Sequence, residues 1–138
     1  MLFWPVKRAT LLIPSGPDHD PDRKHFFILL TDPIAVPDIA AKQVLLVGIA
    51  TRNPNFQHDP TCILYPGDHP FINRESYVNY RLARIEDADK LAAGVKNGIF
   101  VPQGTIDTAI FARVCQGLLN SRHTTPKVLR FYQTSTGR

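Results

Sequence analysis

The spacing of proline is the feature of this sequence that most limits its fold. Twelve prolines in 138 residues divide most of the chain into short pieces. Proline lacks a backbone N–H and clashes with the preceding helical turn, so long helices are excluded from these pieces. The apolar runs that remain between turn-forming residues have the length of β-strands. The sequence therefore predicts a sheet of short strands.

Two of the apolar runs have the composition of central strands. Residues 25–31 and 43–51 are dense in β-branched, aromatic and leucine side chains, which is typical of strands buried on both faces. Residues 76–85 mostly alternate polar with apolar side chains, as expected of a strand with one face in water. The full set of expected strands is 9–14, 25–31, 43–51, 61–65, 76–85 and, last in the chain, 127–132.

Two helices are expected where prolines are rare. Residues 105–120 place an apolar side chain at every fourth position from Ile106 to Leu118, the pattern of an amphipathic helix that covers a sheet. A shorter helix is expected to begin in the acidic segment 86–91, because acidic side chains suit the positive end of the helix dipole. The expected irregular segments are exposed loops at 15–23 and 52–60 and a frayed tail at 134–138.

These elements predict the fold class. Several short strands followed by a helix indicate one α+β domain over residues 1–138. A small sheet must curl or leave its edges exposed, so we expect a strongly curved, barrel-like antiparallel sheet with a C-terminal amphipathic helix. Hydrophobic residues make up 43% of the chain, and a chain of this length can bury a core without a disulfide or metal. Cys62 and Cys115 lie in apolar settings and are expected to be free and buried.

The hydropathy and charge of the sequence indicate where in the cell the protein is expected and what kind of partner it could bind. No segment approaches the roughly 20 apolar residues that span a bilayer, and the first charges follow the first apolar residues, the reverse of a secretory signal. We therefore expect a cytoplasmic protein with no membrane association. The net charge is +4, and no acidic residue follows Asp107. A basic C-terminal third is typical of a surface that meets nucleic acid or an acidic partner, and equally of a solvated surface without a ligand.

Three pairings of aspartate with histidine occur in the expected loops. They are Asp18-His19-Asp20, His58-Asp59 and Asp68-His69. Histidine can act as acid, base or metal ligand near neutral pH, but these spacings match no zinc pattern, so we expect no metal and no cofactor. His69 stands in a short turn between two prolines. A rigid turn suits a catalytic side chain, and it also suits a side chain that merely completes the turn.

A second cluster depends on how two strands pair. Arg23, Lys24 and His25 stand at the start of one central strand, and Thr51 and Arg52 stand at the end of the next. If the two strands pair antiparallel, these side chains converge on one edge of the sheet. Cations, an imidazole and a hydroxyl together suit the cleavage of RNA without metal. The alternative is a basic loop cluster with no special role.

The order of these elements resembles the MazF/PemK-like toxin family. The matching segments are a polar loop, the strands at 24–31 and 43–52, the stretch 75–85 and the helix at 105–119. The resemblance implies an SH3-like barrel, a homodimer, single-stranded RNA as the substrate and an antitoxin protein as a partner. A threonine ends the third strand in the family, and Thr51 matches it. An arginine opens the second strand there, whereas Lys24 and His25 hold that place here and Arg23 precedes them.

The leading hypothesis is therefore a toxin-like endoribonuclease that needs no metal. Its expected catalytic residues are His25, Thr51 and His69. Its expected substrate-binding residues are Arg23, Lys24, Arg52, Asp68 and Ser76. One alternative is a non-catalytic module that binds nucleic acid or protein through the same basic edge. Another is a metal-dependent enzyme that uses the aspartate–histidine loops.

Overall fold

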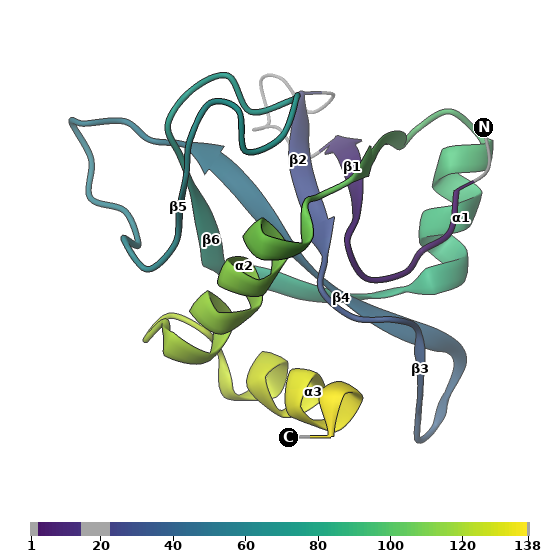
Figure 1. The fold of residues 1–138 in the computed structure, drawn as a ribbon. Coiled ribbons are helices and arrows are strands. Elements are labelled where there is room, and N and C mark those ends of the chain that lie inside the picture. The colour runs from purple at the N-terminus through teal and green to yellow at the C-terminus, as the bar shows by residue number, and fades with distance from the viewer. Residues whose placement is uncertain (1–2, 15–22, 138) are drawn as a thin grey trace.

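The structure is a computed structural model that describes residues 3–14 and 23–137. These residues form an α+β domain in which one curled sheet is flanked by helices (Figure 1). The strands are β1 (Ala9–Pro14), β2 (Lys24–Leu29), β3 (Ile34–Val36), β4 (Ile39–Thr51), β5 (Ile63–Leu64), β6 (Ser76–Asp87) and β7 (Val101–Thr105). The helices are α1 (Ala88–Lys96), α2 (Thr108–Asn120) and α3 (Pro126–Thr136).

The sheet is antiparallel, and its strands follow the order β5-β6-β4-β2-β1-β7, with β3 paired to β4 outside this path. β5 and β7 lie at the two ends of the order and are not paired with each other in the described part of the chain. The sheet is therefore a curled half-barrel (Figure 1), which has the strong curvature that was expected of it. Proline and glycine in β7 and the two-residue length of β5 protect these edges.

The two central strands are buried on both faces, as their composition predicted. On one face, which we call the α2 face, Ile28, Leu45 and Val47 pack beneath α2 and α3. On the other, which we call the α1 face, Leu29 and Leu46 pack against α1. Alternate residues of the same strands thus feed two separate cores, which explains the near-continuous apolar runs in the sequence.

Helix α2 is held to the sheet by contacts at both its start and its middle. The carboxylate of Asp107 caps the helix by accepting from the amides of Ala109 at 2.9 Å and Ile110 at 3.2 Å. The buried Tyr80 hydroxyl of β6 donates to the carbonyl of Val114 at 2.7 Å. Gly117 makes this approach possible, since a Cβ there would overlap the Tyr80 hydroxyl.

The segment at 127–132 is a helix, and the strand expected there is wrong. α3 starts at Pro126, and the hydroxyl of Thr125 accepts from the Val128 amide at 3.4 Å. A threonine cap followed by proline is a helix-start signal. The buried side chains Val128, Phe131 and Tyr132 have the three-to-four-residue spacing of a helix face. α3 continues to Thr136, so most of the tail expected at 134–138 is ordered, and α2 is not the last element.

Two short strands were not expected. β3 forms a hairpin with the start of β4 through Asp38, whose φ of 67° is in the left-handed region that aspartate tolerates. β7 contains Pro102, which is accepted because β7 is an edge strand. Short edge strands contribute little hydrophobic patterning, so the sequence carries a weak signal for them.

The cysteines and the hydropathy of the helices agree with the composition of the sequence in the described residues. Cys62 and Cys115 are both buried, as expected, and neither forms a disulfide within the described residues. Burial raises the pKa of the Cys62 thiol, which makes it a poor nucleophile. Among the helices of residues 3–14 and 23–137, none has both the length and the apolar character needed to cross a membrane.

Candidate functional site

Three strand ends meet at one edge of the curled sheet. β2 pairs antiparallel with β4, with Phe26 opposite Ile49, so the start of β2 lies beside the end of β4 (Figure 1). β4 in turn pairs with β6, with Thr51 opposite Ser76. The pairing on which the predicted RNA site depended is therefore present.

These ends surround a pocket of about 320 Å³, which we call the rim pocket. Of the eight predicted site residues, five line it: Arg23, Lys24, His25, Thr51 and Ser76. The Ser76 hydroxyl donates to the carbonyl of Arg74 at 2.8 Å. The rim pocket thus gathers two cations, an imidazole and two hydroxyls from three strands.

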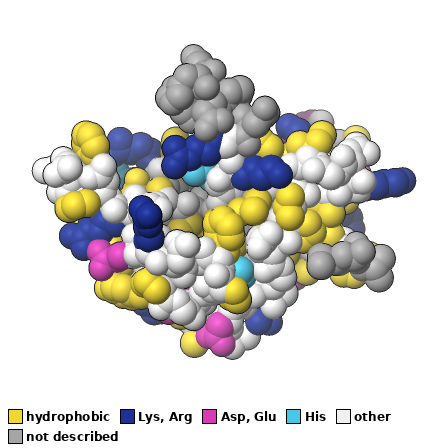
Figure 2. Space-filling view, turned by 90° about the horizontal axis from the view of Figure 1, so that it is seen from above, with side chains coloured by type: hydrophobic (Ala, Val, Ile, Leu, Met, Phe, Trp, Pro, Cys, Tyr) yellow, Lys and Arg dark blue, Asp and Glu magenta, His cyan; other side chains and the backbone are white. Residues whose placement is uncertain are grey.

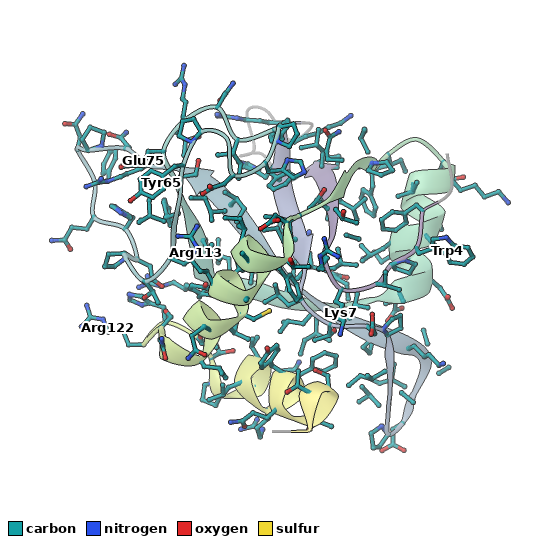
Figure 3. All side chains as sticks on the ribbon, viewed as in Figure 1. Trp4, Lys7, Tyr65, Glu75, Arg113 and Arg122 are labelled. Atoms are coloured by element: carbon teal, nitrogen blue, oxygen red, sulfur yellow. The ribbon has the colours of Figure 1, made fainter. Side chains whose placement is uncertain are left out.

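Arg52 and Asp68 are placed elsewhere. Arg52 forms an ion pair with Glu75, and its amide donates to the Glu75 carbonyl at 2.9 Å. Asp68 accepts from the Tyr65 amide at 2.8 Å and forms an ion pair with Arg113 at 3.4 Å. Figure 3 shows Arg113 on α2 pointing toward Tyr65 and the turn after β5. Both predicted substrate-binding side chains therefore make contacts within the protein and do not line the rim pocket.

His69 lies behind the rim pocket and does not line it. Its Nδ1 accepts from the Phe71 amide at 3.0 Å, and its Nε2 donates to the Gln103 carbonyl at 3.0 Å. Only the neutral tautomer can make both bonds, and burial lowers the pKa of His69. Its ring packs against Phe26, which stacks on Phe71. In this arrangement both ring nitrogens are occupied, so His69 stabilises the turn and the wall of the pocket and has no free nitrogen for acid–base chemistry.

Two further hollows lie on the α1 face, whereas Phe26, Ile49 and Ile72 of the rim pocket belong to the core of the α2 face. A middle pocket of about 360 Å³ shares His25, Ile49 and Ala50 with it. A far pocket of about 380 Å³ shares Asn79 and Leu82 with the middle pocket. The middle pocket crosses from β2 over β4 to β6 and adjoins the rim pocket at the edge of the sheet through the residues that they share, and we refer to the three hollows together as the groove.

A register shift in β6 and small residues in β4 open the middle of this groove. Leu46 pairs with Arg84 but Gly48 pairs with Asn79, so β6 bulges between these pairs. The bulge leaves the side chain of Leu82 65% exposed. In the floor of the groove, a Cβ at Gly48 would lie 3.2 Å from the Phe27 ring. The α1 face of the sheet is therefore open, shallow and apolar at this point, whereas the α2 face of the same strands is covered by helices.

The groove is strongly biased toward positive charge. The middle pocket contains Arg84, whose guanidinium lies over the Phe27 ring at 4.6 Å. The far pocket contains Arg81 and Arg122. Asp59 is the one acidic side chain among the described residues that line the three pockets. Figure 2 shows the end of the molecule that includes the start of β2, where Lys and Arg side chains outnumber acidic ones.

The cationic residues of the far pocket were not singled out as site residues in the sequence. Arg81, Arg122 and His123 are separated along the chain and are brought together by the packing of β6 against the turn after α2. The sequence does contain two features of this pocket, the His58-Asp59 pair and the basic C-terminal third. Neither feature shows that β6 contacts the turn after α2.

The aspartate–histidine loops do not gather metal ligands in the described part of the structure, where no three His, Cys, Asp or Glu side chains form such a cluster. Asp18, His19 and Asp20 lie outside the described residues.

Comparisons with known proteins identify no family for this chain: no protein-family model matches it, and no curated protein or solved structure matches it.

Proposed function

We propose that this protein is an endoribonuclease that cleaves single-stranded RNA without a metal ion, with the scissile phosphate in the rim pocket. The observation that carries the proposal is the convergence of Lys24, His25 and Thr51 from two paired strands on one open pocket. Cations beside a proton-exchanging group and a hydroxyl are the groups that phosphodiester cleavage needs.

Each group has a chemical role in this proposal. His25 takes the proton of the ribose 2′-hydroxyl as that oxygen attacks the neighbouring phosphorus. Lys24 and Arg23 stabilise the negative charge of the phosphorane, and Thr51 orients a phosphate oxygen. The bond from phosphorus to the 5′-oxygen then breaks, and this oxygen takes a proton from the protonated His25 or from Lys24. The products are a 2′,3′-cyclic phosphate and a 5′-hydroxyl end, so protons and charge balance without a further reactant.

The groove favours a single strand over a duplex. Its cationic side chains suit a phosphate backbone. Its apolar surface around Leu82 and Ala50 suits the faces of unpaired bases, which a duplex keeps stacked inside. The curled sheet is, in this proposal, a divergent form of the SH3-like barrel of the MazF/PemK-like toxins. That relationship adds a homodimer and an antitoxin that covers the groove as proposed partners.

The direct test is to incubate the purified protein with single-stranded RNA in excess EDTA. Wild-type protein is expected to produce 2′,3′-cyclic phosphate ends, detected by mass spectrometry of the fragments. His25→Ala and Lys24→Ala are each expected to slow cleavage by at least about a hundredfold, as for loss of a general base. Lys127→Ala, which removes an exposed cation on α3, is the matched control. Unchanged cleavage in both pocket variants would discard the rim pocket as the active site.

The main alternative is a module that binds nucleic acid without cleaving it. The same cationic groove favours this function, because it requires no proton transfer at His25. RNA binding that weakens steeply with salt, with no fragments formed by wild-type protein, would establish the binding module in place of the nuclease.

If the nuclease is a toxin, its expression is expected to arrest growth, and the His25→Ala and Lys24→Ala substitutions are expected to relieve the arrest.

A further inference from the structure

The far pocket has no role in the proposed cleavage, and side chains from several parts of the chain enclose it. Its walls come from three separate segments: residues 57–60 of the loop after β4, residues 77–82 of β6, and Arg122 and His123 in the turn between α2 and α3. Figure 3 shows Arg122 extending from this turn at the side of the molecule.

A buried carboxylate joins two of these walls. Asp59 is 9% exposed, and its Oδ1 accepts from the amide and the hydroxyl of Thr61 at 3.0 and 2.5 Å. Its Oδ2 accepts from the Ser121 hydroxyl at 2.5 Å, and the Ser121 oxygen accepts from the His123 amide at 3.1 Å. The acidic charge of the far pocket is thus used inside the protein, and the pocket is held in shape by it.

Beside the amide side chains of Gln57 and Asn79, the far pocket holds the cationic donors Arg81 and Arg122 and the imidazole of His123. Arg81 donates from Nη2 to Nδ1 of His123 at 2.9 Å. Because arginine has no acceptor, Nδ1 must accept, and the hydrogen of this neutral imidazole is on Nε2. Arg122 has no hydrogen-bond or ion-pair partner among the described residues. Two guanidinium groups and one imidazole N–H in a hollow of about 380 Å³ match the oxygen atoms of a phosphate.

Aromatic and apolar surface lies beside these donors. The ring of His58 packs on Tyr77 with 5.0 Å between the ring centres. Leu82, the exposed residue of the β6 bulge, separates the far pocket from the middle pocket and lines both. A nucleotide has the same two parts, a phosphate beside a flat apolar base, and the far pocket offers a surface for each.

We propose that the far pocket is a phosphate subsite that holds the RNA strand away from the bond that is cut. Arg81, Arg122 and His123 bind a backbone phosphate, and the adjoining base packs over Leu82. The inference rests on the proposed function of the rim pocket and extends it. Two strand spacings, about 10 Å, separate β2 from β6, so an RNA strand in the groove occupies the two pockets with different nucleotides. The substrate class is accordingly a single-stranded oligonucleotide longer than a dinucleotide.

The first experiment measures RNA binding without cleavage. A fluorescent 2′-O-methyl oligoribonucleotide, which has no attacking hydroxyl, is titrated with protein and followed by fluorescence anisotropy. Arg81→Ala and Arg122→Ala are each expected to raise Kd about tenfold, because a hydrogen bond between charged groups is lost. Each is also expected to lower the slope of log Kd against log salt by about 0.7, the value for one single-strand phosphate contact. Arg130→Ala, an exposed cation on α3, is the control and is expected to change neither quantity.

The second experiment separates this subsite from the nuclease itself. With natural RNA, Arg122→Ala is expected to lower kcat/KM for a long strand about tenfold and to leave the cleavage of a dinucleotide unchanged. Thermal unfolding checks that the Arg81→Ala and Arg122→Ala proteins remain folded, and a loss of fold in one leaves the other as the test.

Three outcomes would overturn the subsite. Wild-type affinity and salt slope in both variants, together with loss of cleavage in His25→Ala, would remove the subsite and leave the proposed nuclease standing. An equal loss of dinucleotide and long-strand cleavage in Arg122→Ala would show an effect on the rim pocket instead. Binding of an acidic peptide through the same arginines, with no binding of RNA by wild-type protein, would assign the far pocket to a protein partner and would remove both proposals.

Discussion

The two faces of the sheet are built from alternate residues of the same strands, yet one is closed along its length and the other is only half closed. On the α2 face, Ile28, Leu45 and Val47 are fully buried beneath α2 and α3. On the α1 face, α1 covers Leu29 and Leu46, but the face beyond Phe27 is open and forms the middle pocket of the groove.

The difference shows that a site can form where the large side chains of a core give way to small ones, because no helix is then bound to that part of the sheet. In β4, large Val47 and Ile49 point to the α2 face, while Gly48 and Ala50 point to the α1 face. Small side chains leave no apolar bulk for a helix to bury, so water or a ligand has access to that part of the sheet. The strands still hold the groove rigid, because their other face is fully packed.

The sharpest test of this contrast makes the same substitution on each face. Leu45→Ala, at a fully buried position of the α2 face, is expected to cost about 2–5 kcal/mol of unfolding free energy through lost burial and a cavity. Leu82→Ala, at a 65% exposed position in the groove, is expected to change it by less than about 0.5 kcal/mol. Urea denaturation measures both. A large loss of stability in Leu82→Ala would mean that the groove side is part of the core.

The contact between β6 and α2 gives the next largest effect. Gly117→Ala places a methyl group on the Tyr80 hydroxyl and is expected to cost about 1–3 kcal/mol, as for other overpacked sites. Gln116→Ala, the exposed neighbour on the same helix, is the control, with an expected change under about 0.5 kcal/mol. In a Tyr80→Phe background the cost of Gly117→Ala is expected to fall, because the overlapping oxygen is gone. Equal costs in the two backgrounds would place the strain elsewhere.

The buried histidine behind the rim pocket is expected to make stability depend on pH. Burial lowers the pKa of His69 in the folded protein, so as pH falls below about 6.5 the unfolded chain takes up a proton that the folded chain does not. Stability is therefore expected to be complete above that pH and to decrease as acid is added. Unfolding between about pH 7 and pH 5 is compared for wild type and His69→Gln. The slope is expected to be shallower in the variant, and identical slopes would contradict the role given to His69.

The smallest expected effect is at Arg52, beside the rim pocket but outside its lining. Arg52→Ala removes an exposed ion pair with Glu75 and is expected to cost less than about 1 kcal/mol. RNA cleavage is expected to decrease less than in Lys24→Ala, because the Lys24 side chain lines the pocket. A larger effect of Arg52→Ala on cleavage would show that this guanidinium leaves Glu75 to bind the substrate.

The parts of this fold that sequence patterns could reveal are those governed by local composition. Residues 25–31 and 43–51 predicted two central strands, and their antiparallel pairing placed Lys24 near Thr51. The apolar positions of residues 127–132 also fit a strand, and only the helix start at Thr125-Pro126 distinguishes the two structures. The far pocket was beyond prediction, since the contact between Arg81 and His123 joins residues 42 positions apart. Such contacts depend on how elements pack, which no local pattern contains.

The carboxylate of Asp59 determines how acidic the solution can become before the far end of the groove loses its shape. Burial alone would raise the pKa of Asp59, but the hydrogen bonds from Ser121 and Thr61 lower it below its ordinary value. The favourable contribution of this ionised group is present above the ordinary aspartate pKa and is lost only as pH falls through the lower folded value. The two segments that it ties together, 62 residues apart in the chain, therefore stay joined at acidic pH, below the pH at which protonation begins to work against the His69 turn.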